Sequence, residues 1–128
     1  MKAFGIKSDV LCAELNWDLI VKHIQSKTKY SEVTKFPSVR RDLALLLDKD
    51  IEFSKLKSLA VETEKKLLKS VNLFDVYQGD KLPNNKKSYA LSFILEDKKN
   101  TLTDSQIDEV MDKLINVFKQ KVGAELRK

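Results

Sequence analysis

Residues 36–48 constrain the fold more than any other stretch of this chain, and they read Phe-Pro-Ser-Val-Arg-Arg-Asp-Leu-Ala-Leu-Leu-Leu-Asp. Proline disfavours a helical conformation in the residue before it, so Phe36 is expected to lead into a strand. The apolar run that follows is short and ends in the polar turn residues Asp48, Lys49 and Asp50. Taken alone, the segment indicates a core strand with a basic lead-in.

The composition favours a single folded domain with at most a short appendage. Of the 128 residues, 42% are hydrophobic, which is enough for one core. Lys and Arg number 24 against 19 Asp and Glu. The resulting net charge of +5 suits a polyanionic partner, and it equally suits a protein that has none.

The chain has one cysteine, Cys12, and one histidine, His23. Neither has the partners that a disulfide, a metal site or nucleophilic catalysis needs, so we expect no function for them and a reducing compartment. The sequence also shows no secretory leader and no apolar run near the ~20 residues that cross a bilayer. It therefore predicts a cytoplasmic chain without a membrane partner.

Residues 1–33 are predicted to be a leader and not a domain. A strand is expected over residues 9–15, a helix is expected to begin at Asn16 or Asp18 and to run through Ile24, and residues 25–29 have the composition of a linker. One strand and one short helix cannot close a core. We interpret this leader as the remnant of a preceding domain, and residues 34–128 as the main domain.

Residues 54–95 alternate between helical and strand periods. Ser54 is a good N-cap for a helix, and residues 71–77 and 87–95 alternate as strands do, with turn residues between them. The residues near helical spacing after Ser54 are Leu56, Leu59, Ala60, Leu67 and Leu68.

The second helix gives the clearest local signal. Thr103 and Gln106 fit a capping box, and Gly123 is placed to end the helix. A strand over residues 124–127 completes a ferredoxin-like βαββαβ order, which is an α+β sandwich with a four-stranded antiparallel sheet and two helices on one face. The apolar stripe of this helix comprises Ile107, Val110, Met111, Leu114, Ile115, Phe118 and Val122.

The face without helices is where a function is expected. If Phe74 and Val76 point to the helices, strand alternation places Asp75 and Tyr77 on the open face. The other residues predicted on or beside this face are small or polar (Asp42, Ala44, Ser88, Ala90, Ser92) or cationic (Arg40, Arg41, Lys86, Lys87, Arg127).

Such a face suits unpaired RNA, whose bases bind by stacking and edge hydrogen bonds while Lys and Arg hold phosphates. A carboxylate repels phosphate, so Asp75 would contribute only by accepting hydrogen bonds from a base such as guanine. The alternative is an ordinary solvated carboxylate paired with Arg41 or Lys87, which would matter little to stability.

Five sequence blocks follow one another along the chain: Phe-Pro-Ser-Val-Arg-Arg-Asp-Leu-Ala (36–44), Leu-Phe-Asp-Val-Tyr-Gln-Gly (73–79), Lys-Lys-Ser-Tyr-Ala-Leu (86–91), Thr-Leu-Thr-Asp (101–104) and Ala-Glu-Leu-Arg (124–127). Together they resemble the C-terminal anticodon-binding domain of the bacterial phenylalanyl-tRNA synthetase beta subunit. Their order and spacing are more specific than any single motif. Residues 1 to about 33, including Ala-Glu-Leu-Asn-Trp-Asp (13–18), resemble the end of the preceding catalytic-like domain of the same subunit.

The resemblance implies a ferredoxin-like domain that binds the anticodon stem-loop of phenylalanine tRNA, with Ala44, Asp75, Ser88 and Arg127 facing the anticodon. It implies a parent ligase of two alpha and two beta subunits, with ATP and Mg²⁺ used in the alpha subunit. No catalytic residue, metal or cofactor is expected on this chain. Asn84 and Asn85 depart from the family, which usually has a glycine before the paired lysines.

Two other functions of similar topology remain as alternatives. A small-molecule-binding regulatory domain usually needs glycine-bearing loops, and the chain has only Gly5, Gly79 and Gly123. An acylphosphatase-like hydrolase needs a phosphate-cradling glycine loop beside an arginine, which is not evident. Residues 98–100 are either a loop that touches the tRNA backbone or a solvated turn.

Overall fold

The computed structural model describes residues 4–6, 9–24, 30 and 32–127, and the chain divides into two compact units, Met1–Glu32 and Val33–Lys128. The first unit contains helix α1 (Trp17–His23), which begins where predicted because the Asn16 side chain accepts a hydrogen bond from the Leu19 amide at 3.0 Å. The strand predicted over residues 9–15 is wrong. A strand needs a neighbouring strand, and the described part of this unit offers none. The predicted linker over residues 25–29 lies outside the described residues.

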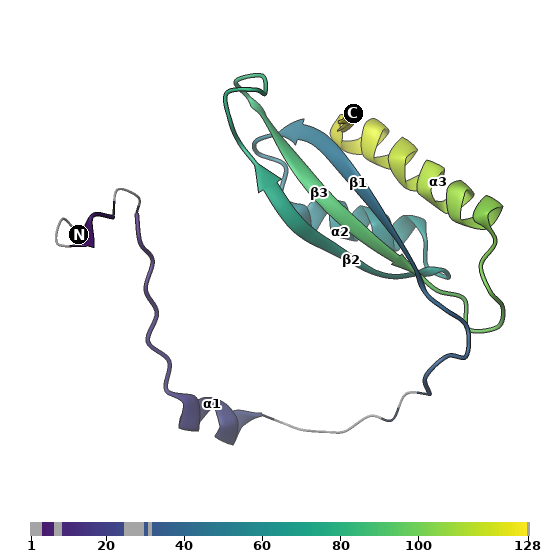
Figure 1. Ribbon diagram of the computed structural model, residues 1–128, viewed down its shortest axis with the longest axis horizontal. Helices are drawn as coiled ribbons and strands as arrows, with labels where there is room; N and C mark the ends of the chain where they lie inside the picture. Colours follow the sequence, from purple (N-terminus) through teal and green to yellow (C-terminus); the bar gives the residue numbers. More distant parts are fainter. Residues whose placement is uncertain (1–3, 7–8, 25–29, 31, 128) are drawn as a thin grey trace. The chain divides into compact units, whose positions relative to one another are not determined.

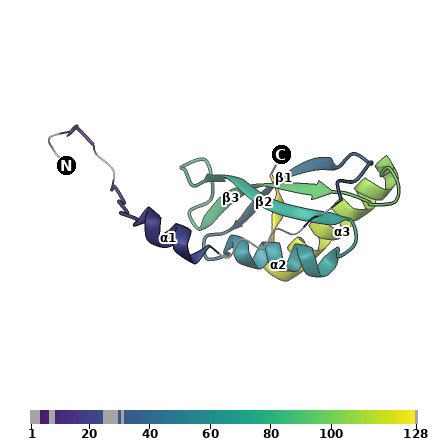
Figure 2. The same cartoon turned by 90° about the horizontal axis from the view of Figure 1, so that it is seen from below.

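The second unit has the predicted βαββαβ order (Figure 1). Its strands form one antiparallel sheet in the order β2-β3-β1-β4. Figure 2 shows α2 and α3 on the same side of this sheet, so neither helix of this unit covers its other face. The elements are β1 (Val39–Asp48), α2 (Phe53–Thr63), β2 (Leu68–Tyr77), β3 (Lys86–Leu95), α3 (Asp104–Val122) and β4 (Glu125–Leu126).

The core lies between the helices and the sheet. Residues at three-and-four spacing on α3 are buried against alternate residues of β1 and β3, and the rings of Phe93 and Phe118 lie 6.2 Å apart between centroids. Helix α2 adds Leu56 and Ala60. Full burial of each large apolar side chain contributes roughly 1.5–3 kcal/mol, so this interface holds the sheet against both helices.

Both ends of α3 follow the sequence prediction. The Thr103 hydroxyl accepts from the Gln106 amide, and the Gln106 side chain accepts from the Thr103 amide at 3.0 Å, which completes the capping box. Gly123 adopts a left-handed φ of 63°, a conformation that suits glycine, and it ends the helix.

Helix α2 differs from its prediction at both ends. Glu52 is the N-cap, and Ser54 lies in the first turn with its hydroxyl donating to the Glu52 carboxylate at 3.0 Å. The helix stops at Thr63 because the Glu64 carboxylate accepts the amides of Lys66 and Leu67 at 2.9 and 3.0 Å, which fixes a turn instead of a further helical turn. Leu67 therefore lies in that turn, and Leu68 begins β2.

The buried residue Leu114 of α3 allows a test of the packing between the helices and the sheet. Leu114→Ala removes a fully buried side chain, and we expect a loss of about 2–5 kcal/mol in the free energy of unfolding, measured with urea. Val61→Ala on α2 is the control, because Val61 is half exposed and its truncation is expected to change stability by less than about 0.5 kcal/mol. Equal losses in the two variants would contradict the assignment of the core.

Candidate nucleic-acid interface

A β-bulge in β2 determines which side chains reach the open face. Leu73 pairs with Leu91, but Asp75 pairs with the very next residue, Ala90, so β2 has one extra residue, Phe74, at this point. Such an extra residue shifts the strand's alternation by one step. Asp75 and Tyr77, which pair with Ala90 and Ser88, therefore lie on the open face as predicted.

Because of the bulge, the predicted orientation of some β2 side chains is wrong. Val71 and Leu73 share the strand phase of Asp75 in the sequence, yet Val71 is buried in the core and Leu73 packs against it. Phe74, which was expected to point to the helices, is 54% exposed and contacts Arg40. Simple alternation fails here because it assumes an unbroken ladder.

A single row of residues crosses the open face from one edge of the sheet to the other. The Arg127 amide donates to the Ala44 carbonyl at 2.9 Å, Ala44 pairs with Ala90, and Ala90 pairs with Asp75. The row thus has a guanidinium at one end, a carboxylate at the other and two methyl groups between them. It brings together three of the residues predicted to face RNA.

Tyr77 and Arg127 contact each other over this row. The guanidinium carbon of Arg127 lies 5.1 Å from the centroid of the Tyr77 ring. Because Arg127 lies at the outer edge of β1 and Tyr77 belongs to β2, the contact passes over β1 and β3, which carry Ala44, Ser88 and Ala90. Ser88 pairs with Tyr77 and is only 4% exposed.

Gly79 positions the Tyr77 ring. A Cβ atom at Gly79 would lie 2.5 Å from the Tyr77 hydroxyl oxygen and 2.7 Å from its Cζ, so the ring rests against the bare glycine backbone. Glycine is required at position 79 because a side chain there would collide with the Tyr77 ring. The backbone conformation of residue 79 does not itself require glycine.

Two cations on the open side, Arg40 and Lys86, are held by carboxylates. Arg40 Nε and Nη2 donate to the two carboxylate oxygens of Asp42 at 2.8 and 3.1 Å, which raises the pKa of Arg40 further above its usual value. Lys86 Nζ lies 3.1 Å from Asp48 Oδ1 and 3.9 Å from Glu125 Oε1.

Arg41 and Lys87 lie on the helix side of the sheet instead. Arg41 pairs with buried Phe93, and its Nη2 atom is 3.9 Å from Asp104 Oδ1 at the start of α3. Lys87 is 5% exposed, with its Nζ atom 4.5 Å from the centroid of the Tyr89 ring. The structure thus does not bring these two cations to the open face.

The position of Arg41 and Lys87 on the helix side argues against the alternative in which one of them pairs with Asp75. Both cations lie across the sheet from Asp75, and among the described residues Asp75 forms no ion pair. Its carboxylate is exposed. It is thus available to accept hydrogen bonds from a ligand.

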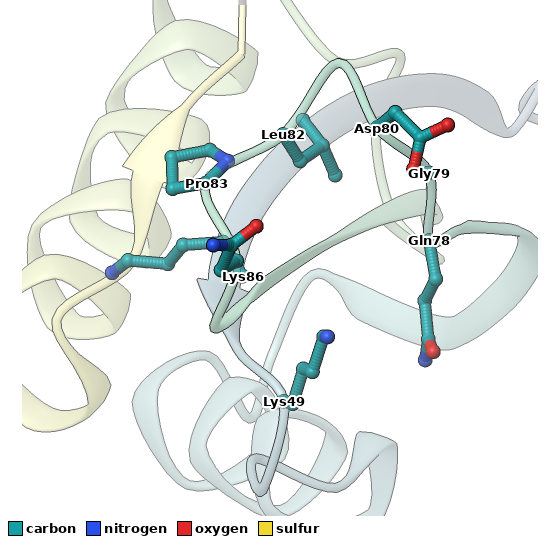
Figure 3. Close-up of a pocket in the computed structure, with 8 residues that line it drawn as sticks. Lys49, Gln78, Gly79, Asp80, Leu82, Pro83 and Lys86 are labelled. Carbon is teal, nitrogen blue, oxygen red and sulfur yellow. The ribbon is translucent and has the colours of Figure 1, made fainter.

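The loop between β2 and β3 bounds a polar hollow of about 230 Å³ beside this face (Figure 3). Asn84 and Asn85 form its turn without a left-handed φ, and the Lys86 amide closes it on the Pro83 carbonyl at 2.9 Å. These two asparagines therefore form the turn without the strain of a left-handed conformation. The lining residues are Lys49, Gln78, Gly79, Asp80, Leu82, Pro83, Asn84 and Lys86.

The described residues offer neither a cluster of metal ligands nor a membrane-spanning helix. No group of three or more His, Cys, Asp or Glu side chains gathers there in a way that could hold a metal ion. No helix in that part of the chain has the length and apolarity to span a bilayer. Residues 98–100 form a bend in which Asp97 Oδ1 accepts from the Lys99 amide at 2.9 Å.

The sequence reasoning missed Phe74 and Gly79 as parts of the face. A signal for Phe74 is present: Val71 and Leu73 have the apolarity of a core phase, whereas Asp75 in the same phase is charged. Such a change of character within one strand indicates a bulge.

An antiparallel sheet with both helices on one side and a polar, aromatic surface on the other defines a ferredoxin-like α+β domain. The profile of the ferredoxin-fold anticodon binding domain matches residues 34–127. The chain belongs to this family.

Its curated relatives are phenylalanine–tRNA ligase beta subunits. The chain is 52% identical to that of Bacteroides fragilis over 128 residues, 48% identical to that of Porphyromonas gingivalis and 44% identical to that of Fusobacterium nucleatum. These matches cover 98–99% of the chain but only 16% of each relative. The chain thus spans less than a fifth of the length of these relatives.

The contact between Gly79 and Tyr77 can be tested directly. Gly79→Ala is expected to displace the Tyr77 ring and to separate it from Arg127, because the added methyl group needs the space of the ring. The ring proton shifts of Tyr77 in NMR spectra report this movement. Gln78→Ala in the same loop is the control and should leave these shifts unchanged; unchanged shifts in Gly79→Ala would contradict the packing described.

Proposed function

We propose that the domain binds the anticodon stem-loop of phenylalanine tRNA through its open face. The observation that carries the proposal is the exposed carboxylate of Asp75, which has no ion-pair partner among the described residues and ends a row of two alanines facing Arg127. A carboxylate there disfavours phosphate but accepts the ring and exocyclic N–H groups of guanine. The two methyl groups leave room for a flat base between Asp75 and Arg127.

Arg127 and Tyr77 supply the remaining contacts. Tyr77 offers an aromatic ring on which a base stacks, and in the free domain Arg127 lies over that ring. When RNA binds, the guanidinium exchanges the ring for a phosphate oxygen, for which its fork geometry is well suited. Ala44 and Ser88 then line the floor beneath the base, while Arg40 and Lys86 lie at its margins.

The parent protein is proposed from the relatives' names and from the short span of the match. We propose that the chain is part of the beta subunit of a phenylalanine–tRNA ligase, which assembles with alpha subunits as two alpha and two beta chains in the cytoplasm. ATP and Mg²⁺ serve the reaction in the alpha subunit, and this chain contributes tRNA binding without catalytic residues.

The first unit is proposed to be the end of a preceding domain. Its described residues include Leu11, Trp17 and Ile24, all exposed although apolar. Exposed apolar side chains grouped in this way indicate a surface that another part of a longer protein covers.

Replacement of the carboxylate tests base recognition. Asp75→Asn in the whole chain should weaken binding of the phenylalanine anticodon stem-loop by roughly 1–3 kcal/mol, the range for a bidentate contact to a base edge. Fluorescence anisotropy at two salt concentrations measures the affinity. Asp112→Asn on α3 is the control, because Asp112 is exposed on a helix away from the open face.

A stem-loop with a changed anticodon completes this experiment. The wild-type chain should prefer the original stem-loop, and Asp75→Asn should lose much of that preference. Binding that ignores the anticodon and vanishes with salt would mean that the face holds only backbone charge.

The reassembled ligase provides a second test. Asp75→Ala and Arg127→Ala should lower the rate of tRNA charging about 10-fold or more, because each removes a contact to the anticodon. Activation of phenylalanine by ATP should stay nearly unchanged, since it needs no tRNA contact here. Equal losses in the two reactions would refute these roles.

A further inference from the structure

We infer that Phe74 and Arg40 form a second stacking platform, which takes an unpaired RNA base next to the one held at Tyr77. The inference rests on the proposed function and adds a nucleotide to it. The platform exists because of the bulge, which turns Phe74 away from the helices and leaves it 54% exposed.

Arg40 belongs to the open side of the sheet. It pairs with Ile94, the residue between Phe93 and Leu95, and both of these are fully buried against the helices. Its guanidinium carbon lies 5.3 Å from the centroid of the Phe74 ring. Because Arg40 is on β1 and Phe74 on β2, this contact also passes over β3.

The guanidinium is held in place and remains charged. Asp42 accepts two hydrogen bonds from it, at 2.8 and 3.1 Å, which fixes its plane and keeps its pKa raised. The Arg40 side chain is still 57% exposed. Fixed guanidinium planes and exposed aromatic rings are the two surfaces on which unpaired RNA bases stack.

The open face thus has two aromatic–guanidinium pairs, Tyr77 with Arg127 and Phe74 with Arg40. Both span β3, and both pair an aromatic residue of β2 with a cation from the opposite half of the sheet. Phe74 and Tyr77 are three residues apart, about 10 Å along a strand. Bases splayed out of one RNA loop can occupy two such places at once.

The two platforms differ in what they recognise. Asp75 lies beside Tyr77 in the strand and can select a base by its N–H groups. At the second platform, the Asp42 carboxylate beside Arg40 is already bonded to that guanidinium. The second platform therefore stacks any base, and it adds affinity without adding choice of sequence.

Phe74→Leu tests the platform because it keeps an apolar side chain but removes the aromatic ring. In the whole chain we expect affinity for the phenylalanine anticodon stem-loop to fall about 10-fold, within the range for loss of one stacked base. The preference for the original over the changed anticodon should stay as in wild type. Val76→Leu is the control, because Val76 pairs with buried Tyr89 on the helix side.

A fluorescent base identifies the stacking itself. 2-Aminopurine placed in turn at each loop position next to the anticodon should be quenched by the wild-type chain at one position and released by Phe74→Leu at that position. Unchanged thermal unfolding of the variant shows that its fold is intact, as expected for an exposed side chain.

The outcomes separate the two proposals. If Phe74→Leu binds and quenches like wild type while Asp75→Asn loses base preference, the platform is wrong and the proposed function stands. If the wild-type chain does not distinguish the stem-loops, both fail. If Phe74→Leu instead abolishes self-association seen by sedimentation and leaves RNA binding unchanged, Phe74 serves contact with a second copy and the inference is overturned.

Discussion

The extra residue in β2 is the constraint on which the rest of the open face depends. Before Phe74 the strand gives its apolar side chains Val71 and Leu73 to the core, and after it the same phase gives Asp75 and Tyr77 to the opposite side. An unbroken strand would have to bury the carboxylate under the helices or expose the two core residues, and both changes cost stability. This bulge lets a ten-residue strand give apolar side chains to the core before Phe74 and polar or aromatic side chains to the open face after it.

Charge on this face is arranged in pairs. Arg40 is bonded to Asp42, Lys86 lies near Asp48 and Glu125, and Arg127 rests on the Tyr77 ring. The chain's net charge of +5 is therefore not gathered into a bare basic patch here. A face of this kind attracts phosphate weakly and leaves selection to its uncompensated carboxylate and its ring surfaces.

The fold could be predicted from the sequence because its main signals are local. The capping box at Thr103, the apolar stripe of α3 and the left-handed Gly123 each depend on neighbours within one or two turns. The failures have non-local or competing causes. The strand expected over residues 9–15 has no neighbouring strand in the described part of its unit, and the Glu64 carboxylate ends α2 early. For the face, the alternation of β3 was sufficient to place Ser88 and Ala90, but Phe74 depended on a register that only the paired strands define.

β4 is only two residues long, and this affects how easily the segment that carries Arg127 opens. The segment after Ala124 is tied to β1 by the ladder from Leu45 and Leu46 and by the Arg127 amide, whereas Ala124 itself is buried in the core. Releasing this segment breaks few backbone hydrogen bonds, and its two strand residues, Glu125 and Leu126, are exposed. Local opening of such an edge requires far less free energy than global unfolding. Arg127 is thus mounted on a two-residue edge strand, so in the proposed complex we expect its contact to be lost by local opening of β4, without unfolding of the domain.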